Sequence, residues 1–138
     1  MSKHSKERLV EWYVASAIYV TRTRREPKRG LFVEERFLLV CSESSDQALK
    51  KATELAKGQQ LRDESLEYDG EPAKEEFVGI RKLISVAPNP LSSSPGTLHD
   101  GCELTYSFYT LRTEDDIQKL VDGSSVHITY LADNKPPR

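Results

Sequence analysis

The residues best suited to chemistry gather near position 100, where a histidine, an aspartate and a cysteine lie close together. His99 directly precedes Asp100, and Cys102 follows three residues after His99. Imidazole and thiolate both bind zinc, but a protein metal site needs three or four convergent ligands. No further ligand accompanies these three residues, so we interpret them as a loop histidine beside a turn-forming aspartate. We predict no bound metal and no cofactor.

Motifs for catalysis or phosphate binding are missing from the sequence. The seven glycines are scattered and form neither a P-loop nor a Gly-x-Gly-x-x-Gly motif, and no Gly-x-Ser-x-Gly elbow occurs. The adjacent carboxylates Glu34-Glu35 and Asp115-Asp116 point in different directions, and Cys41 is typical of a small apolar residue at a strand end. We therefore predict no catalytic residue and no enzyme, with a small-molecule sensor or minor enzyme using His99 and Cys102 as an alternative.

A basic turn is the sharpest charged feature. Its five cations lie within eight residues and are offset only by Glu26: Arg22, Arg24, Arg25, Lys28 and Arg29. Arginines on a protruding hairpin can bind phosphate backbones, and Tyr19 and Phe32 at its base could stack on bases. Residues 63–76, however, hold seven acids against one lysine. We interpret the two runs as solvated or paired with each other, with partner recognition and nucleic-acid binding as alternatives.

Length and composition predict one soluble domain. A chain of 138 residues can bury a core without disulfides, and a net charge of −2 favours neither nucleic acid nor an acidic membrane. The two cysteines lie too far apart for a disulfide framework or a thiolate metal site. No apolar run is long enough to cross a bilayer, and the charged first residues do not resemble a signal peptide. We expect a cytoplasmic protein.

The first half of the chain predicts two strands and a helix. A strand over 11–22 places one alternating set of side chains on one face (Trp12, Val14, Ile18, Val20) and a second set on the other (Tyr13, Ala15, Ala17, Tyr19). A second strand over 31–42 is apolar on both faces at its centre, which is typical of a strand inside a sheet. Ser44 and Gln47 then form a capping box for a helix that Gly58 ends.

The second half predicts three further strands and a second helix. Residues 59–76 are a polar connection with a turn at Tyr68-Asp69-Gly70, and strands follow over 77–87, 103–111 and 125–131. Residues 88–101 form a long loop rich in proline and serine, and Thr113 caps a helix that Gly123 ends. The predicted domain spans 11–132, between flexible tails at 1–10 and 133–138.

The expected fold is α+β with two layers. Its order ββα-ββα-β gives a mixed, mostly antiparallel sheet of about five strands with two helices on one face, and each helix should join parallel strands. The other face then carries rings such as Tyr13, Tyr19 and Tyr109. An uncovered face of this kind meets another subunit, a partner or the loops of its own chain.

Several of these stretches resemble one small bacterial family. They are Trp12-Tyr13-Val14-Ala15, residues 35–40, residues 45–52, Phe77-Val78-Gly79-Ile80 and residues 103–108. The chain is similar over about 12–108 to the domain-of-unknown-function family numbered 4288. The resemblance implies the fold and a bacterial cytoplasmic setting, and it transfers no catalytic residue because the family has no assigned activity.

Together these observations favour a non-catalytic protein-binding or assembly module, of the accessory or immunity type. The expected partner is another protein or a second copy in a homodimer, with no membrane contact. The expected contact residues are Tyr13, Tyr19, Arg22, Arg24, Arg25, Lys28, Arg29 and Tyr109. Nucleic-acid binding through residues 22–29 is the alternative.

Overall fold

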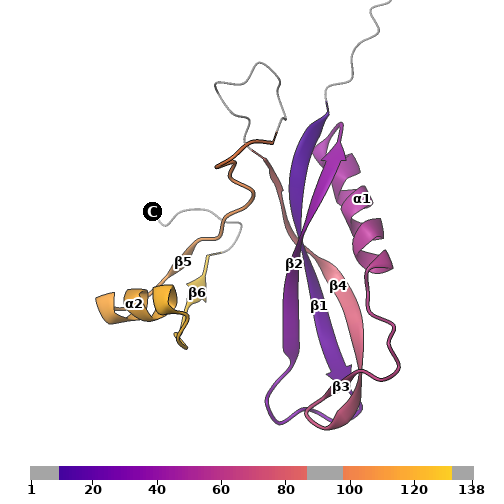
Figure 1. The fold of residues 1–138 in the computed structure, drawn as a ribbon, viewed down its shortest axis with the longest axis vertical. Helices are drawn as coiled ribbons and strands as arrows, with labels where there is room; N and C mark the ends of the chain where they lie inside the picture. The colour runs from indigo at the N-terminus through magenta and orange to yellow at the C-terminus, as the bar shows by residue number, and fades with distance from the viewer. Residues whose placement is uncertain (1–9, 87–97, 132–138) are drawn as a thin grey trace, which may run out of the picture. The chain divides into compact units, whose positions relative to one another are not determined.

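A computed structural model describes residues 10–86 and 98–131 (Figure 1). The chain divides into two compact units, one reaching Leu104 and the other beginning at Thr105. The predicted tails, apart from residue 10, and most of the predicted loop over 88–101 lie outside the described residues.

The first unit is built on an antiparallel sheet with the order β2-β1-β4-β3. The strands are β1 (Glu11–Thr23), β2 (Phe32–Ser42), β3 (Glu67–Tyr68) and β4 (Glu71–Ser85). The long central strand β1 pairs with β2 along its length and with β4 on its other side. The α+β class with an antiparallel sheet is confirmed, but β2 lies at an edge of this sheet, so the prediction of an interior strand is wrong for the single chain.

Helix α1 (Ser45–Gly58) packs on one face of the sheet. The Ser44 hydroxyl accepts a hydrogen bond from the backbone N–H of Gln47 at 3.2 Å, which confirms the predicted N-cap. Gly58 is the last helical residue, and Gln59 follows as the cap with φ −95°. The predicted left-handed glycine stop is therefore wrong, because the helix ends without a left-handed residue.

The core between α1 and the sheet is made of small side chains. Ala52 packs against Ala15 and Val40, and Ala56 packs against Ala17 and Tyr19. Alanines on both surfaces allow the helix to approach the central strand closely. The helix therefore covers the face with Tyr13 and Tyr19, which we call the helix face, and the expectation that this face is uncovered is wrong.

The turn between β3 and β4 confirms one prediction and extends it. Asp69 and Gly70 both have positive φ, at 57° and 78°, as the two central residues of a type I′ hairpin require. The strands on either side were missed, and β4 begins at Glu71 rather than at the predicted residue 77. Register shifts in the β1–β4 pairing then break the regular alternation that the sequence suggested.

The second unit contains β5 (Tyr109–Thr110), α2 (Glu114–Asp122) and β6 (Thr129–Tyr130). Thr113 and Gly123 cap α2 as predicted, with the glycine left-handed at φ 78°. Among the described residues, the two short strands pair with each other and with no further strand. The prediction of one five-stranded sheet is therefore wrong. The strands predicted at 103–111 and 125–131 pair with each other, and they do not join the sheet of long strands.

The connections of the two helices differ. Strands β2 and β4 are both antiparallel to β1, so they run in the same direction, as predicted for residues 31–42 and 77–87. The two-residue strand β3, however, comes first after α1 and is antiparallel to β4. Helix α2 joins antiparallel strands, so the same prediction is wrong there. Neither helix in the described parts of the chain is long and apolar enough to span a membrane.

Candidate functional site

The tyrosines predicted to contact a partner do not form one exposed surface. Tyr19 is 1% exposed and donates its hydroxyl to the Ala56 carbonyl at 2.7 Å, and Tyr13 is also buried. Tyr109 belongs to the second unit, where its ring meets that of Tyr130 edge-on at 5.4 Å. Tyr13 and Tyr19 are therefore core residues, and the prediction that they supply contact area is corrected.

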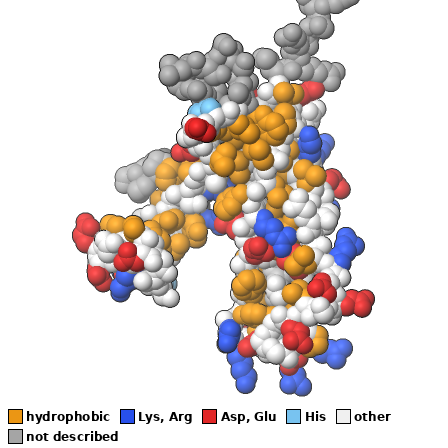
Figure 2. Space-filling model, viewed as in Figure 1, with side chains coloured by type: hydrophobic (Ala, Val, Ile, Leu, Met, Phe, Trp, Pro, Cys, Tyr) orange, Lys and Arg blue, Asp and Glu red, His pale blue; other side chains and the backbone are white. Residues whose placement is uncertain are grey.

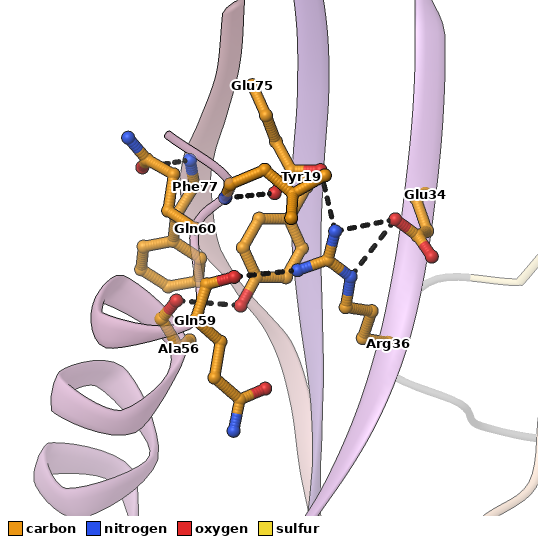
Figure 3. A network of polar contacts seen from close by, with 9 residues as sticks. Tyr19, Glu34, Arg36, Ala56, Gln59, Gln60, Glu75 and Phe77 are labelled. Atoms are coloured by element: carbon orange, nitrogen blue, oxygen red, sulfur yellow. Dashed lines mark hydrogen bonds and ion pairs between the residues drawn. The ribbon is translucent and has the colours of Figure 1, made fainter. Parts of the chain in front are cut away.

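Arg36 is the centre of a polar network on the helix face (Figure 3). Its guanidinium lies 3.8 Å above the centre of the Tyr19 ring. It donates to Glu34 at 2.8 Å and to Glu75 at 2.6 Å, and it also reaches the Gln59 carbonyl at 3.2 Å. One arginine on β2 thus joins the central strand, β4 and the end of α1.

Glu75 extends this network to the residues that follow α1. It is 6% exposed and accepts a hydrogen bond from the Leu61 N–H at 2.8 Å. The neighbouring Gln60 side chain accepts from the Phe77 N–H at the same distance, as Figure 3 shows. The segment after the helix is therefore fastened against β4.

The electrostatics of this network favour a structural role. The hydrogen bond to Glu34 raises the pKa of Arg36, with Glu75 contributing in the same direction. Burial raises the pKa of the Tyr19 phenol, so this group keeps its proton at neutral pH and does not suit acid–base catalysis. The sequence carried a signal for this site: Arg36 has the same parity as Leu38 and Val40, so a charge falls on the buried face of the strand.

The basic turn faces acids from the β3–β4 hairpin. Arg29 lies 3.8 Å from Asp69, whose carboxylate also accepts a hydrogen bond from the Lys28 backbone N–H at 3.0 Å. Two further pairs join Arg25 to Glu71 at 3.9 Å and Arg22 to Glu76 at 2.6 Å. A pocket of about 270 Å³ between the two turns has lining side chains of both signs. The two charged runs predicted from sequence therefore do meet.

The residues around position 99 form a turn. The Cys102 N–H donates to the His99 carbonyl at 3.1 Å, and the His99 ring contacts the Asp100 carbonyl oxygen at 2.9 Å. Neither Cys41 nor Cys102 forms a disulfide. Within residues 10–86 and 98–131, no group of three or more His, Cys, Asp or Glu side chains is arranged to hold a metal ion.

The face of the sheet opposite α1 presents large apolar side chains to solvent. Phe37, Val33 and Leu39, which alternate along β2, are 53%, 52% and 42% exposed. By register these three residues lie opposite Ser16, Val20 and Val14 of β1. Those β1 residues are buried, so the exposed apolar surface lies on β2. We call this surface the bare face. Figure 2 shows hydrophobic side chains gathered over the upper part of the sheet and charged ones at the hairpin turns.

One charged group on the bare face is poorly satisfied. The Oε2 atom of Glu35 is buried without a hydrogen-bond partner among the described residues. Burial lowers the pKa of Lys82, while the charge of Glu35 acts in the opposite direction. A buried carboxylate oxygen without a donor costs free energy.

The family comparison covers the first unit. A family model described as a domain of unknown function (DUF4288) matches residues 12–107. No curated protein and no solved structure matches the chain. The matched region contains the four-stranded sheet apart from Glu11, together with α1 and the Arg36 network, and it is well over half of the 138 residues. The chain is a member of the DUF4288 family.

Proposed function

We propose that this protein is a non-catalytic protein-binding or assembly module that binds through the bare face and the adjoining edge of β2. The observation that carries the proposal is the exposure of Val33, Phe37 and Leu39 on one face of one strand. Contiguous exposed apolar side chains on a sheet mark an interaction surface. Aromatic anchors such as Phe37 are typical of the centre of protein interfaces.

The composition of this surface suits a protein partner. Its apolar side chains Val33, Phe37 and Leu39 offer contact area to such a partner. By analogy with other small binding modules, we place the protein in the bacterial cytoplasm as an accessory or immunity-type component.

The basic turn supports the nucleic-acid alternative less well. Arg22, Arg25 and Arg29 each have a carboxylate partner on β4 or the β3–β4 turn. These pairs offset the local positive charge that phosphate binding requires. The turn is therefore outside the proposed binding surface.

Site-specific photo-crosslinking tests the proposal. A photoreactive amino acid replaces Val33 or Leu39 in cells that make the protein, and Lys50 or Lys57 on the exposed side of α1 serves as the control position. We expect discrete protein adducts at 33 and 39 and none at the two controls. Adducts at no position, or equally at all four, would contradict the proposal.

A second step measures affinity with the identified partner in purified form. Phe37→Asp should weaken binding by about tenfold or more, because it places a charge at the centre of the apolar surface. Lys50→Asp is the matched control, since it adds the same carboxylate on the opposite side of the unit, and it should leave affinity unchanged.

A further inference from the structure

The sequence of β2 suits the interior of a sheet, yet the strand lies at an edge. Residues 37–41 are all apolar, with side chains on both faces, and Phe32–Ser42 pairs with β1 on one side only. Strands that read as continuous apolar runs are normally flanked on both sides. The pattern indicates that a second neighbour completes the sheet beside β2.

The backbone geometry shows which groups are free. The Val86 N–H donates to the Trp12 carbonyl, so the even-numbered residues of β1 direct their backbone groups toward β4 and the odd-numbered ones toward β2. The register pairs Ala17 with Arg36 and Ser16 with Phe37. The odd-numbered residues of β2 therefore point their N–H and C=O groups away from β1. We call the outward groups of Val33, Glu35, Phe37 and Leu39 the free edge.

One contact supports this assignment. The Lys51 ammonium donates to the Cys41 carbonyl at 2.8 Å, so an odd-numbered carbonyl does point outward, and it is capped at the end of the strand. Within the described residues, no other segment forms a backbone hydrogen bond to the free edge. Neither proline nor a bulge interrupts the strand there. Prolines and bulges are two of the devices that proteins use to prevent edge pairing.

We infer that β2 pairs antiparallel with β2 of a second copy of this chain, about a two-fold axis at Phe37. This inference deepens the proposed function and depends on it, since it names the partner for the same surface. A two-fold axis requires a self-complementary edge. Phe37 is the middle residue of Phe32–Ser42, so this register pairs the whole strand with itself.

Registers centred closer to the start of β2 are less favourable. An axis at Arg36 or at Glu35 would place two like charges directly opposite each other, which destabilises a strand pair. With the axis at Phe37, Glu35 faces Leu39 and Arg36 faces Leu38 of the second copy, so no like charges meet directly. The two Phe37 rings then lie side by side on the bare face.

The resulting dimer has a defined architecture. The two sheets form one continuous sheet with four strands from each copy. Because the axis is perpendicular to the sheet, both α1 helices lie on one side and both bare faces on the other. The dimer thus doubles the apolar surface around Phe37.

A proline substitution tests whether the free edge forms the dimer, with the mass measured by size-exclusion chromatography and light scattering. Glu35→Pro removes one outward N–H and leaves every β1–β2 hydrogen bond in place, a position where edge strands tolerate proline. Glu35→Ala is the matched control, because it removes the carboxylate but keeps the N–H. We expect the measured mass of wild type and of Glu35→Ala to be about twice the 15.7 kDa of one chain. The mass of Glu35→Pro should be that of a single chain. A monomeric wild type, or a dimeric Glu35→Pro, would overturn the inference.

Cysteine crosslinking tests the register without depending on the proline variant. In a Cys41→Ser, Cys102→Ser background, single cysteines replace Glu35, Phe37 or Leu39, and diamide oxidises them. Paired residues in a hydrogen-bonded position lie about 5.5 Å apart, within disulfide range, whereas positions 35 and 39 would lie about 14 Å from their own copies. Intermolecular disulfide at 37 alone is expected, and a maximum at 35 or 39, or none at all, would overturn the register at Phe37.

The two proposals fail in different ways. A monomeric wild type that still forms photo-adducts with another protein at positions 33 and 39 would remove the dimer and keep the binding function. A monomer without any adduct would remove both.

Discussion

The outward backbone groups of β4 and β2, on the two outer sides of the same sheet, differ in their hydrogen bonding. The outward N–H groups of Ala73 and Phe77 on β4 are bonded to the Leu66 carbonyl and the Gln60 side chain, which follow α1 in sequence. On β2, the outward groups between Val33 and Leu39 have no such partner among the described residues. Within its described residues the chain therefore closes one edge of the sheet and leaves the other open.

The segment after α1 that bonds to the outer side of β4 is held in place by the Arg36 network. Glu75 holds the Leu61 N–H, and Arg36 holds both Glu75 and the Gln59 carbonyl. The same arginine is a residue of the open strand β2. A side chain from the open strand thus helps to hold the segment that closes the other edge.

The largest effect is expected from Arg36→Ala. The substitution leaves the buried Glu75 carboxylate without its cation, which costs about 3–5 kcal/mol of unfolding free energy. Urea unfolding of Arg36→Ala and wild type measures the difference in unfolding free energy. Faster amide exchange at Phe77 would show that the segment after α1 no longer holds β4. Arg62→Ala, in an exposed position of the same segment, is the control with a change below about 0.5 kcal/mol. An Arg36→Ala loss as small as the control would show that the network is not structural.

Tyr19→Phe should lower the unfolding free energy by about 1 kcal/mol at neutral pH, because it removes the hydrogen bond to Ala56. Burial raises the pKa of Tyr19 above 10.0 in the folded state, so the folded protein holds the phenolic proton more tightly than the unfolded chain. Stability is therefore complete below pH 10 and falls as the pH rises through the folded-state pKa.

The phenylalanine variant should show a weaker loss of stability at alkaline pH, and buried Tyr13 accounts for the dependence that remains. Chemical unfolding between pH 8 and pH 11 measures this, with Tyr68→Phe as the matched control for an exposed hydroxyl bond. Identical alkaline slopes for wild type and Tyr19→Phe would contradict the assignment.

A third substitution examines the hairpin that pairs with the start of β4. Gly70 has φ 78°, so Gly70→Ala should cost about 1–2 kcal/mol of unfolding free energy through backbone strain. Gly58→Ala provides the control, since Gly58 is helical and alanine there should stabilise by up to about 0.5 kcal/mol. Thermal unfolding of both variants should give shifts of opposite sign, and shifts of the same sign would argue against the type I′ turn.

The smallest effect is expected in the basic turn, which lies apart from the free edge. Arg29→Ala removes an exposed ion pair and should change stability by less than about 0.5 kcal/mol. Titration of wild-type protein with a generic oligonucleotide at low salt should show no binding. Salt-sensitive binding that Arg24→Glu abolishes would instead favour nucleic-acid recognition.

Local features of this fold are readable from sequence. Ser44, Thr113 and Gly123 act as predicted because a cap depends on residues within one helical turn. The Asp69-Gly70 turn is likewise local. At each of these positions the local structure depends on a hydrogen bond or dihedral angle set by neighbouring residues. No residue distant in sequence is needed to specify that structure.

The arrangement of the strands is less predictable because it depends on distant partners. The alternation in β1 predicted two faces but not that α1 covers the one with Tyr19. Glu75 lay in an apparently polar connection, and its burial follows from Arg36, 39 residues earlier. The apolar pattern of β2 predicted an interior strand, and within a single chain this prediction is wrong. In the proposed dimer β2 has neighbours on both sides.

Amide hydrogen exchange at two protein concentrations tests the open edge most directly. Exchange at the inward amides of Glu34, Arg36 and Leu38 should be slow at every concentration, because these groups bond to β1. The outward amides of Glu35, Phe37 and Leu39 should exchange slowly in concentrated protein and rapidly on dilution. Rapid exchange at those outward amides at every concentration would contradict association through β2.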